Sequence, residues 1–101
     1  MSKLYAIITR DRPGATAIRM EKLKQHLAHV EEHMDTLAVA GPLRDEAGAF
    51  TGSLLVVKAE SEAEARALLQ SDPYFQADIW SDIEVRAFGA AAGEWVGGKT
   101  W

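Results

Sequence analysis

The sequence predicts an α+β domain in which the secondary-structure elements follow the order β-α-β-β-α-β. Two stretches without Gly or Pro have the length and residue pattern of helices. Four shorter apolar segments, bounded by Gly, Pro or Asp, have the pattern of strands. The chain has 101 residues, which is enough for one domain with one modest hydrophobic core.

The first half of the chain is predicted to contain a strand, a long helix and a second strand. The strand is LYAII, residues 4–8, a short apolar run that precedes the turn-like sequence RDRPG. The helix extends from about Ala15 to Met34, where apolar residues recur at spacings of three and four. The second strand is TLAVA, residues 36–40, which ends at a Gly-Pro pair.

The second half supplies the remaining strands and a second helix. GSLLVV, residues 52–57, is predicted to form a hairpin with the preceding strand. A helix is expected at 60–70, with Ser61 as its N-cap and Glu64 completing a capping box, and an Asp-Pro pair ends it. IEVRAF, residues 83–88, alternates as a half-buried strand does. This order is the split βαβ pattern of ferredoxin-like domains.

The strands differ in polarity, and the difference predicts the assembly. Residues 4–8 and 54–57 are apolar on both faces, whereas the last strand carries Glu84 and Arg86 on one face. The first and third strands are therefore expected at the centre of the sheet. Both helices cover one sheet face in this topology, so the other apolar face would contact water in a monomer. We expect a homodimer that packs sheet face against sheet face.

Composition excludes several classes of partner and chemistry. The chain has no cysteine, so it forms neither a disulfide framework nor a thiolate metal site. A net charge of −4 without a Lys/Arg-rich block argues against nucleic-acid binding. No apolar run is long enough to cross a bilayer, and the run at 4–8 is shorter than the core of a secretory signal. We expect a cytoplasmic protein without a membrane or nucleic-acid partner.

All three histidines lie within eight residues of the first predicted helix, in HLAHVEEH. At about 100° per residue, one arc of this helix is apolar and is expected to face the sheet. It contains Met20, Leu23, Leu27, Val30 and Met34. A neighbouring stripe of the same helix consists of basic side chains and histidines. It contains Arg19, Lys22, His26, His29 and His33.

The histidine spacing does not favour a metal site or a serine hydrolase. His29 and His33 have the i, i+4 spacing of a helical clamp, but Val30 stands where an HExxH motif has its glutamate. His26 lies roughly 10 Å along the helix from His33, too far to share one ion. No serine lies in a Gly-x-Ser-x-Gly elbow. One histidine and a carboxylate suffice for acid/base chemistry, but a histidine at the edge of an apolar arc is more often a boundary residue with satisfied hydrogen bonds.

Four short segments, in their order and spacing, resemble the YciI-like (YCII-related) family over residues 3–90. They are H-L-A-H (26–29), A-G-P-L (40–43), F-T-G-S (50–53) and D-P-Y (72–74). The resemblance implies a ferredoxin-like domain that dimerises as an α/β barrel. On this basis residues 1–90 form the YCII-related domain and residues 91–101 a C-terminal tail.

The resemblance also implies a catalytic pair, His26 and Asp72, and gives no role to the other two histidines. Asp72 follows the second predicted helix in a rigid Asp-Pro turn, and both helices cover the same sheet face, so the two residues can meet over a cleft. Tyr74 is expected to supply an apolar wall and Ser53 a hydrogen bond to substrate. The alternative is structural, because Asp72 can simply cap backbone amides at its turn.

The cationic stripe and the tail complete the predicted site. Arg19 and Lys22 would attract an anionic substrate, and Phe75 would extend the apolar wall. The tail lies outside the resemblance and contains Trp95 and Trp101, which we expect to lie on the domain or on the partner subunit. A lid over the ligand cleft is the alternative role.

The function implied by the resemblance is enzymatic, because one relative acts as a dehydrochlorinase on chlorinated aromatics. The leading interpretation is a small cofactor-independent enzyme of lyase or isomerase type, without a metal, acting on a small anionic or phenolic molecule. The same fold hosts muconolactone isomerases, monooxygenases and ligand-sensing domains, so fold alone does not decide. A non-catalytic binding or sensor module, and a structural subunit of a larger complex, are the alternatives.

Overall fold

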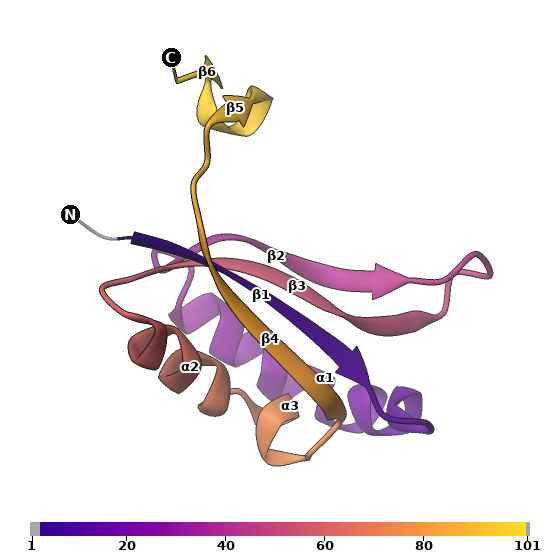
Figure 1. Ribbon diagram of the computed structural model, residues 1–101. Helices are drawn as coiled ribbons and strands as arrows, with labels where there is room; N and C mark the ends of the chain where they lie inside the picture. The colour runs from indigo at the N-terminus through magenta and orange to yellow at the C-terminus, as the bar shows by residue number, and fades with distance from the viewer. Residues whose placement is uncertain (1–2, 101) are drawn as a thin grey trace.

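The computed structural model describes residues 3–100 and has one four-stranded antiparallel sheet with its helices on one face (Figure 1). The elements are β1 (Lys3–Asp11), α1 (Ala15–Glu32), β2 (Leu37–Arg44), β3 (Phe50–Ala59), α2 (Glu62–Gln70), α3 (Pro73–Gln76), β4 (Trp80–Phe88), β5 (Ala92–Gly93), the 3-10 turn η1 (Glu94–Val96) and β6 (Gly98–Lys99). The strand order is β2-β3-β1-β4. The predicted ferredoxin-like α+β fold and the central position of β1 and β3 are confirmed.

The short helix α3 was not predicted, and it forms where the second helix was expected to end. Asp72 is its N-cap and accepts a hydrogen bond from the Tyr74 backbone N–H, while Pro73 occupies the first helical turn. An Asp N-cap followed by Pro can begin a helix as well as end one. The N–H at the first helical position has no partner within the helix, so proline, which lacks an N–H, is tolerated there. The Asp-Pro pair therefore ends α2 and begins α3.

The hydrophobic core lies between β1, β3, β4 and α2. Tyr5 and Ile7 of β1 are buried on the helix side, against Val57 of β3 and Val85 of β4. Because side chains alternate along a strand, Ile8 points to the opposite face, where it is 41% exposed. The structure thus decides which face of the first strand is core and which is open.

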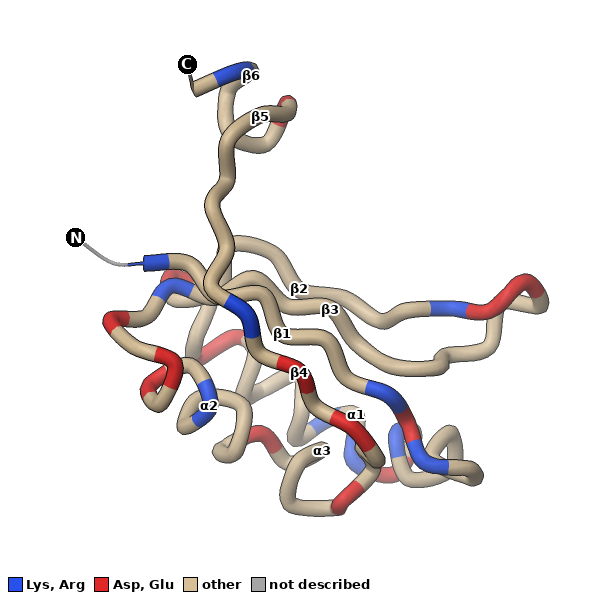
Figure 2. The backbone as a smooth tube through the Cα atoms, viewed as in Figure 1, with Lys and Arg blue, Asp and Glu red and all other residues tan. Residues whose placement is uncertain are grey.

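The open face is apolar at its centre and charged at one edge. Ala6 pairs with Val56, and Ile8 pairs with Leu54, in the register of β1 and β3. Figure 2 shows that the middle of β1, β2 and β3 carries no charged residue, whereas β4 carries charges of both signs. The predicted homodimer would cover this surface and stays a prediction.

The apolar arc of α1 was expected to face the sheet; Leu23, Leu27 and Val30 lie on that side, but they line a cavity and are not closely packed against the strands. Met20 and Met34 are 67% and 62% exposed, and Leu23 and Leu27 are 38% and 49% exposed. The buried residues of this helix are Ala15 and Arg19. Polar contacts from the other stripe hold α1 against α3, so Leu23 and Leu27 face the sheet across a cavity rather than in close contact.

Position 52, in the F-T-G-S segment, requires a glycine for a steric reason. Gly52 is paired with Arg10 of β1, and a Cβ added at Gly52 would overlap the carbonyl oxygen of Thr9. The space beside Gly41 of β2 is open by comparison, since no atom lies within 4 Å of its added Cβ.

Gly52→Ala is therefore expected to lower the free energy of unfolding by about 1–3 kcal/mol or more, because β1 and β3 must separate to admit the methyl group. Urea denaturation followed by circular dichroism measures the change. Gly41→Ala is the matched control and is expected to change the free energy of unfolding by less than about 1 kcal/mol. Equal effects at both positions would contradict the steric explanation.

The tail forms a small hairpin of its own, in which β5 pairs with β6 around η1. It points away from the helix layer (Figure 1). Trp95 is 83% exposed, so within one chain it does not lie on the domain; Trp101 lies outside the described residues. Packing of the tail on a partner subunit stays a prediction. Within residues 3–100, no helix is both long and apolar enough to span a bilayer.

Candidate active site

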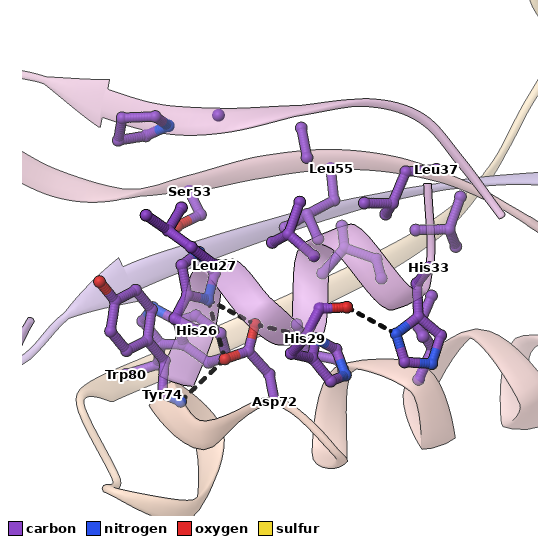
Figure 3. Close-up of a pocket in the computed structure, with 18 of the residues that line it drawn as sticks. His26, Leu27, His29, His33, Leu37, Ser53, Leu55, Asp72, Tyr74 and Trp80 are labelled. Atoms are coloured by element: carbon purple, nitrogen blue, oxygen red, sulfur yellow. Dashed lines mark hydrogen bonds and ion pairs between the residues drawn. The ribbon is translucent and has the colours of Figure 1, made fainter. Parts of the chain in front are cut away.

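A cavity of about 310 Å³ lies between α1 and the helix-side face of β2 and β3, with α3 at one end (Figure 3). It is lined by Ile7, Arg19, Leu23, His26, Leu27, His29, Val30, His33, Leu37, Ala40, Gly41, Pro42, Phe50, Ser53, Leu55, Val57, Leu68, Leu69, Asp72, Tyr74 and Trp80. Five of the predicted site residues are in this wall, although they come from three separate parts of the chain. Sequence-distant residues therefore converge on one concave site.

His26 and Asp72 are in direct contact at the wall of this cavity. The Nδ1 atom of His26 lies 3.0 Å from Oδ1 and 2.9 Å from Oδ2 of Asp72. Asp72 itself is only 3% exposed. An ionised carboxylate only accepts hydrogen bonds, so Nδ1 carries the hydrogen and a neutral ring keeps its lone pair on Nε2. Nε2 makes no hydrogen bond with any other residue in the described part of the chain. His26 can therefore accept a proton through Nε2.

Asp72 is held in place by its role as a helix cap. Its Oδ1 accepts the Tyr74 backbone N–H at 2.8 Å, and Pro73 restricts the turn that follows it. The structural interpretation of Asp72 from the sequence thus describes one of its contacts, and the contact with His26 is additional. A capped, buried carboxylate has little freedom to move, which fixes the direction of the imidazole.

Tyr74 supports both the histidine and α1. Its ring stacks on the His26 ring with centroids 3.9 Å apart and planes 10° apart, and its hydroxyl donates to the Arg19 carbonyl at 3.1 Å. Trp80 contacts the Tyr74 ring edge to face. Burial raises the pKa of Tyr74 above its ordinary value, against the opposing effect of the Arg19 guanidinium. The phenol therefore stays protonated at neutral pH and acts as a donor.

Arg19 is buried and is paired with a carboxylate that the sequence analysis did not identify. Its guanidinium contacts both carboxylate oxygens of Asp11, at 2.6 and 2.9 Å, and Nη2 also donates to the Gly52 carbonyl and to Ser53 Oγ. Asp11 balances the charge that was expected to attract an anion. Nη1 makes no hydrogen bond to the other described residues, so this nitrogen of the guanidinium remains available as a donor.

Two other residues named from the sequence do not reach the cavity wall. Lys22 is half-buried on α1 and does not line the cavity. Phe75 packs against the hydrophobic core instead of extending the apolar wall. For Phe75 the reason is the short helix α3, in which consecutive residues point in different directions, so Phe75 packs on the core while Tyr74 lines the cavity.

His29 and His33 lie beyond Asp72 along the same stripe of α1. Ser71 Oγ uses its hydrogen on the Leu68 carbonyl, so it accepts the hydrogen of His29 Nε2 at 2.7 Å. His33 Nδ1–H donates to the His29 carbonyl at 2.7 Å. Among the described residues, no three His, Cys, Asp or Glu side chains are grouped as metal ligands would be.

The electrostatics keep His29 neutral. Burial lowers the pKa of His29 below its ordinary value; the Asp72 carboxylate opposes this shift, whereas His33 and His26 add to it. The Nδ1 atom of His29 is 3.8 Å from Asp72 Oδ2, compared with 2.9 Å for His26. Asp72 is therefore hydrogen-bonded to one histidine, His26, and lies beside a second one that is uncharged at neutral pH.

Sequence reasoning missed several residues that shape the site. Asp11 ends β1 and pairs with Arg19 eight residues later, and no periodicity in the sequence connects them. Trp80 begins β4 upstream of the alternating pattern that marked this strand. Leu27 of α1 and Leu55 of β3 line opposite sides of the cavity, and the sequence pattern assigned neither of them a role in the site.

The sequence pattern of the YCII-related domain matches residues 3–89. Protein YciI of Escherichia coli is 31% identical over 93 residues, covering 84% of this chain and 95% of the relative. An uncharacterized protein of Haemophilus influenzae is 30% identical over 92 residues, covering 83% of this chain and 94% of the relative.

Two solved structures are similar in fold. The 5-chloro-2-hydroxyhydroquinone dehydrochlorinase TftG of Burkholderia phenoliruptrix, in complex with 2,5-dihydroxybenzoquinone, has a TM-score of 0.78 at 28% identity, covering 90% of this chain and 96% of that one. A protein of unknown function from Nitrosomonas europaea has a TM-score of 0.54 at 18% identity, covering 92% and 95%, and shows the fold alone. The match over nearly the whole domain and the two relatives together establish the family: the chain belongs to the YCII-related family.

Proposed function

We propose that this chain is a small enzyme of lyase or isomerase type that moves a proton on a phenolic or quinoid substrate, with His26 as the base and Asp72 as its orienting partner. The observation that carries the proposal is the geometry of the pair. A buried carboxylate binds Nδ1, Tyr74 stacks on the ring, and Nε2 is left as the nitrogen without a protein partner at a cavity wall. This is the arrangement that a general base requires.

The similarity to a dehydrochlorinase supports the choice of reaction. With a chlorinated hydroxyarene, Nε2 of His26 would take a hydroxyl proton, and the electron pair of that bond would form a carbonyl. The imidazolium would return the proton to the chlorine-bearing carbon. Removal of a second hydroxyl proton then forms the second carbonyl as the C–Cl bond breaks, so the products are a quinone, chloride and one proton. No oxidant is consumed.

Ser53 and Arg19 are proposed to bind the oxygen atoms of the substrate. Both side chains line the cavity, and they are hydrogen-bonded to each other at 3.2 Å. A carbonyl or phenolate oxygen that gains charge during the reaction would be stabilised by the donor that remains free on Arg19. Because Asp11 neutralises this guanidinium, its contribution is directional and short-ranged.

The test is turnover of a chlorinated hydroxyhydroquinone, measured by quinone absorbance and chloride release. We expect turnover by the wild-type chain and a roughly 10²- to 10⁴-fold lower kcat for His26→Gln, because the base is lost. His33→Gln is the matched control, since His33 is the C-cap of α1 and its ring hydrogen-bonds to the His29 carbonyl and lies beside the His29 ring, away from Asp72. Binding of 2,5-dihydroxybenzoquinone without turnover of the chlorinated hydroxyhydroquinone would instead favour the sensor or binding-module alternative and overturn the enzyme proposal.

We also propose that two copies pack through the open face of the sheet. The uncharged centre of β1, β2 and β3 lies on this face, and the tail leaves β4 in the direction away from the helices (Figures 1 and 2). A second copy on this face would be within reach of the tail and could cover Trp95, which is 83% exposed in one chain. The assembly would leave the cavity by His26 on the outer, helix side of each sheet.

A further inference from the structure

The cavity beside His26 is larger than one aromatic ring requires. Its volume is about 310 Å³. An apolar cavity of about 150 Å³ is enough to bind one benzene ring in a protein interior. A single hydroxylated ring placed at His26 would therefore leave roughly half of this cavity unfilled.

Most polar groups lie at one end of the cavity, whereas leucine side chains of β2 and β3 line the wall toward the other end, where His33 of the helix side is also a lining residue. Figure 3 shows His26, Ser53 and Tyr74 gathered at one end, with Leu55 farther along and Leu37 near the other end. The strand register agrees. Ser53 pairs with Pro42, and Leu37 pairs with Val57 at the opposite end of the same strand pair. A ring bound at His26 would lie at the polar end.

The apolar wall is not covered by the protein itself. Leu27 is 49% exposed and Leu23 is 38% exposed, although both line the cavity on the side of α1. The opposite wall is formed by Leu55 of β3 and Leu37 of β2. Leucine side chains on both sides of a gap gain free energy when an apolar group fills it.

Polar contacts prevent the helix from closing this gap by moving onto the sheet. Arg19, in the first half of α1, is held to Asp11 by two hydrogen bonds, and His26, in the second half, is held to Asp72. All four residues are half-buried or buried, so separating these pairs to let α1 collapse would leave charged or polar groups without partners. The cavity is a preformed space, as ligand sites usually are.

We propose that the substrate is a hydroxylated aromatic or quinoid ring that carries an apolar substituent of about one ring's volume. The ring lies against His26 and Tyr74, and the substituent lies between Leu27 and Leu55. The ring chemistry rests on the proposed function, whereas the substituent rests on the volume and the lining of the cavity. The substrate class is thus an alkyl- or aryl-substituted hydroxyarene and not a bare ring.

The test measures the Kd of 2,5-dihydroxybenzoquinone and of its 3-methyl, 3-butyl and 3-phenyl derivatives by isothermal titration calorimetry. Each added methylene is expected to tighten binding by about fourfold, so the butyl derivative gains roughly 10²-fold. Leu27→Asn is expected to lose about tenfold of this gain while the Kd of the unsubstituted ring changes by less than about twofold.

Met20→Asn is the matched control. Met20 lies on the same helix and is exposed, but it does not line the cavity. Its replacement by Asn therefore lowers helix propensity by a similar amount without changing a contact to the ligand. Thermal denaturation of both variants checks that they fold equally well. The same Kd for bare and butyl-substituted rings, or an equal gain in Leu27→Asn and Met20→Asn, would overturn the inference.

Failure of the proposed function gives a different result from failure of this inference. If turnover occurs but the substituents do not tighten binding, the enzyme proposal stands and the substituent assignment falls. If the substituents tighten binding through Leu27 but no ring is turned over, the apolar subsite stands and the catalytic role of His26 falls.

Discussion

Asp72→Asn is expected to lower kcat by about 10²- to 10⁴-fold while the protein stays folded. The amide of asparagine presents an N–H donor as well as an acceptor, so it can turn its donor toward His26 Nδ1. The neutral imidazole then carries its hydrogen on Nε2 and can no longer accept a proton from substrate, an effect known for triads in which the orienting Asp is replaced. Folding is preserved because Asn is as good an N-cap as Asp.

Two measurements separate this positioning role from a structural one. Nitrogen NMR of the imidazole ring reports the tautomer, which should change from Nδ1–H to Nε2–H in Asp72→Asn, and thermal denaturation reports stability. Asp82→Asn is the control, because Asp82 is an exposed carboxylate of β4 with no contact to the cavity. A kcat for Asp72→Asn within about twofold of wild type would contradict the assigned role of this carboxylate.

Ile8→Lys is expected to convert a dimer of the wild-type chain into a folded monomer. Ile8 lies on the open face of the sheet, 41% exposed in one chain and opposite Leu54. In a face-to-face dimer it would be buried, and a two-fold axis would place the new lysine at the interface twice. An unpaired buried charge costs about 3–5 kcal/mol, so the dissociation constant should rise by at least roughly 10²- to 10⁴-fold.

Sedimentation equilibrium at micromolar concentration distinguishes the two states. Ile7→Lys, one residue earlier, is expected to unfold the domain instead, because Ile7 is fully buried on the helix side. Met20→Lys adds the same charge to exposed apolar surface on α1 and should leave the dimer intact. A wild-type chain that sediments at the mass of one chain would refute the face-to-face assembly and leave the apolar centre of the open face without an explanation.

The sequence predicted the order of the main strands and helices because that order depends on local signals. A capping box at Ser61 and apolar alternation in the strands are properties of neighbouring residues, and they fix secondary structure. The candidate pair came from the family resemblance carried by the segments H-L-A-H and D-P-Y, and in the structure the side chains of His26 and Asp72 are in contact. Their catalytic role remains a proposal.

The contacts of α1 could not be predicted in the same way. Periodicity correctly grouped Leu23 with Leu27 on one arc and Arg19 with His26 on another. It did not show that the polar arc makes the close contacts, because this depends on Asp11 and on the turn after α2. A buried Arg is stable only when such partners are present, and partners distant in sequence leave no periodic signal.

The sequence by itself determined which residues share a face and which strands are central, because side-chain direction repeats every two residues in a strand and every 3.6 in a helix. Only the tertiary structure decided which face of β1 is open, how far α1 stands from the sheet, and that the charge of Arg19 is balanced by Asp11. The physical reason is that an amphipathic pattern fixes orientation but not separation. Separation is set by hydrogen bonds and ion pairs between residues far apart in the chain, and here they hold open the cavity beside His26.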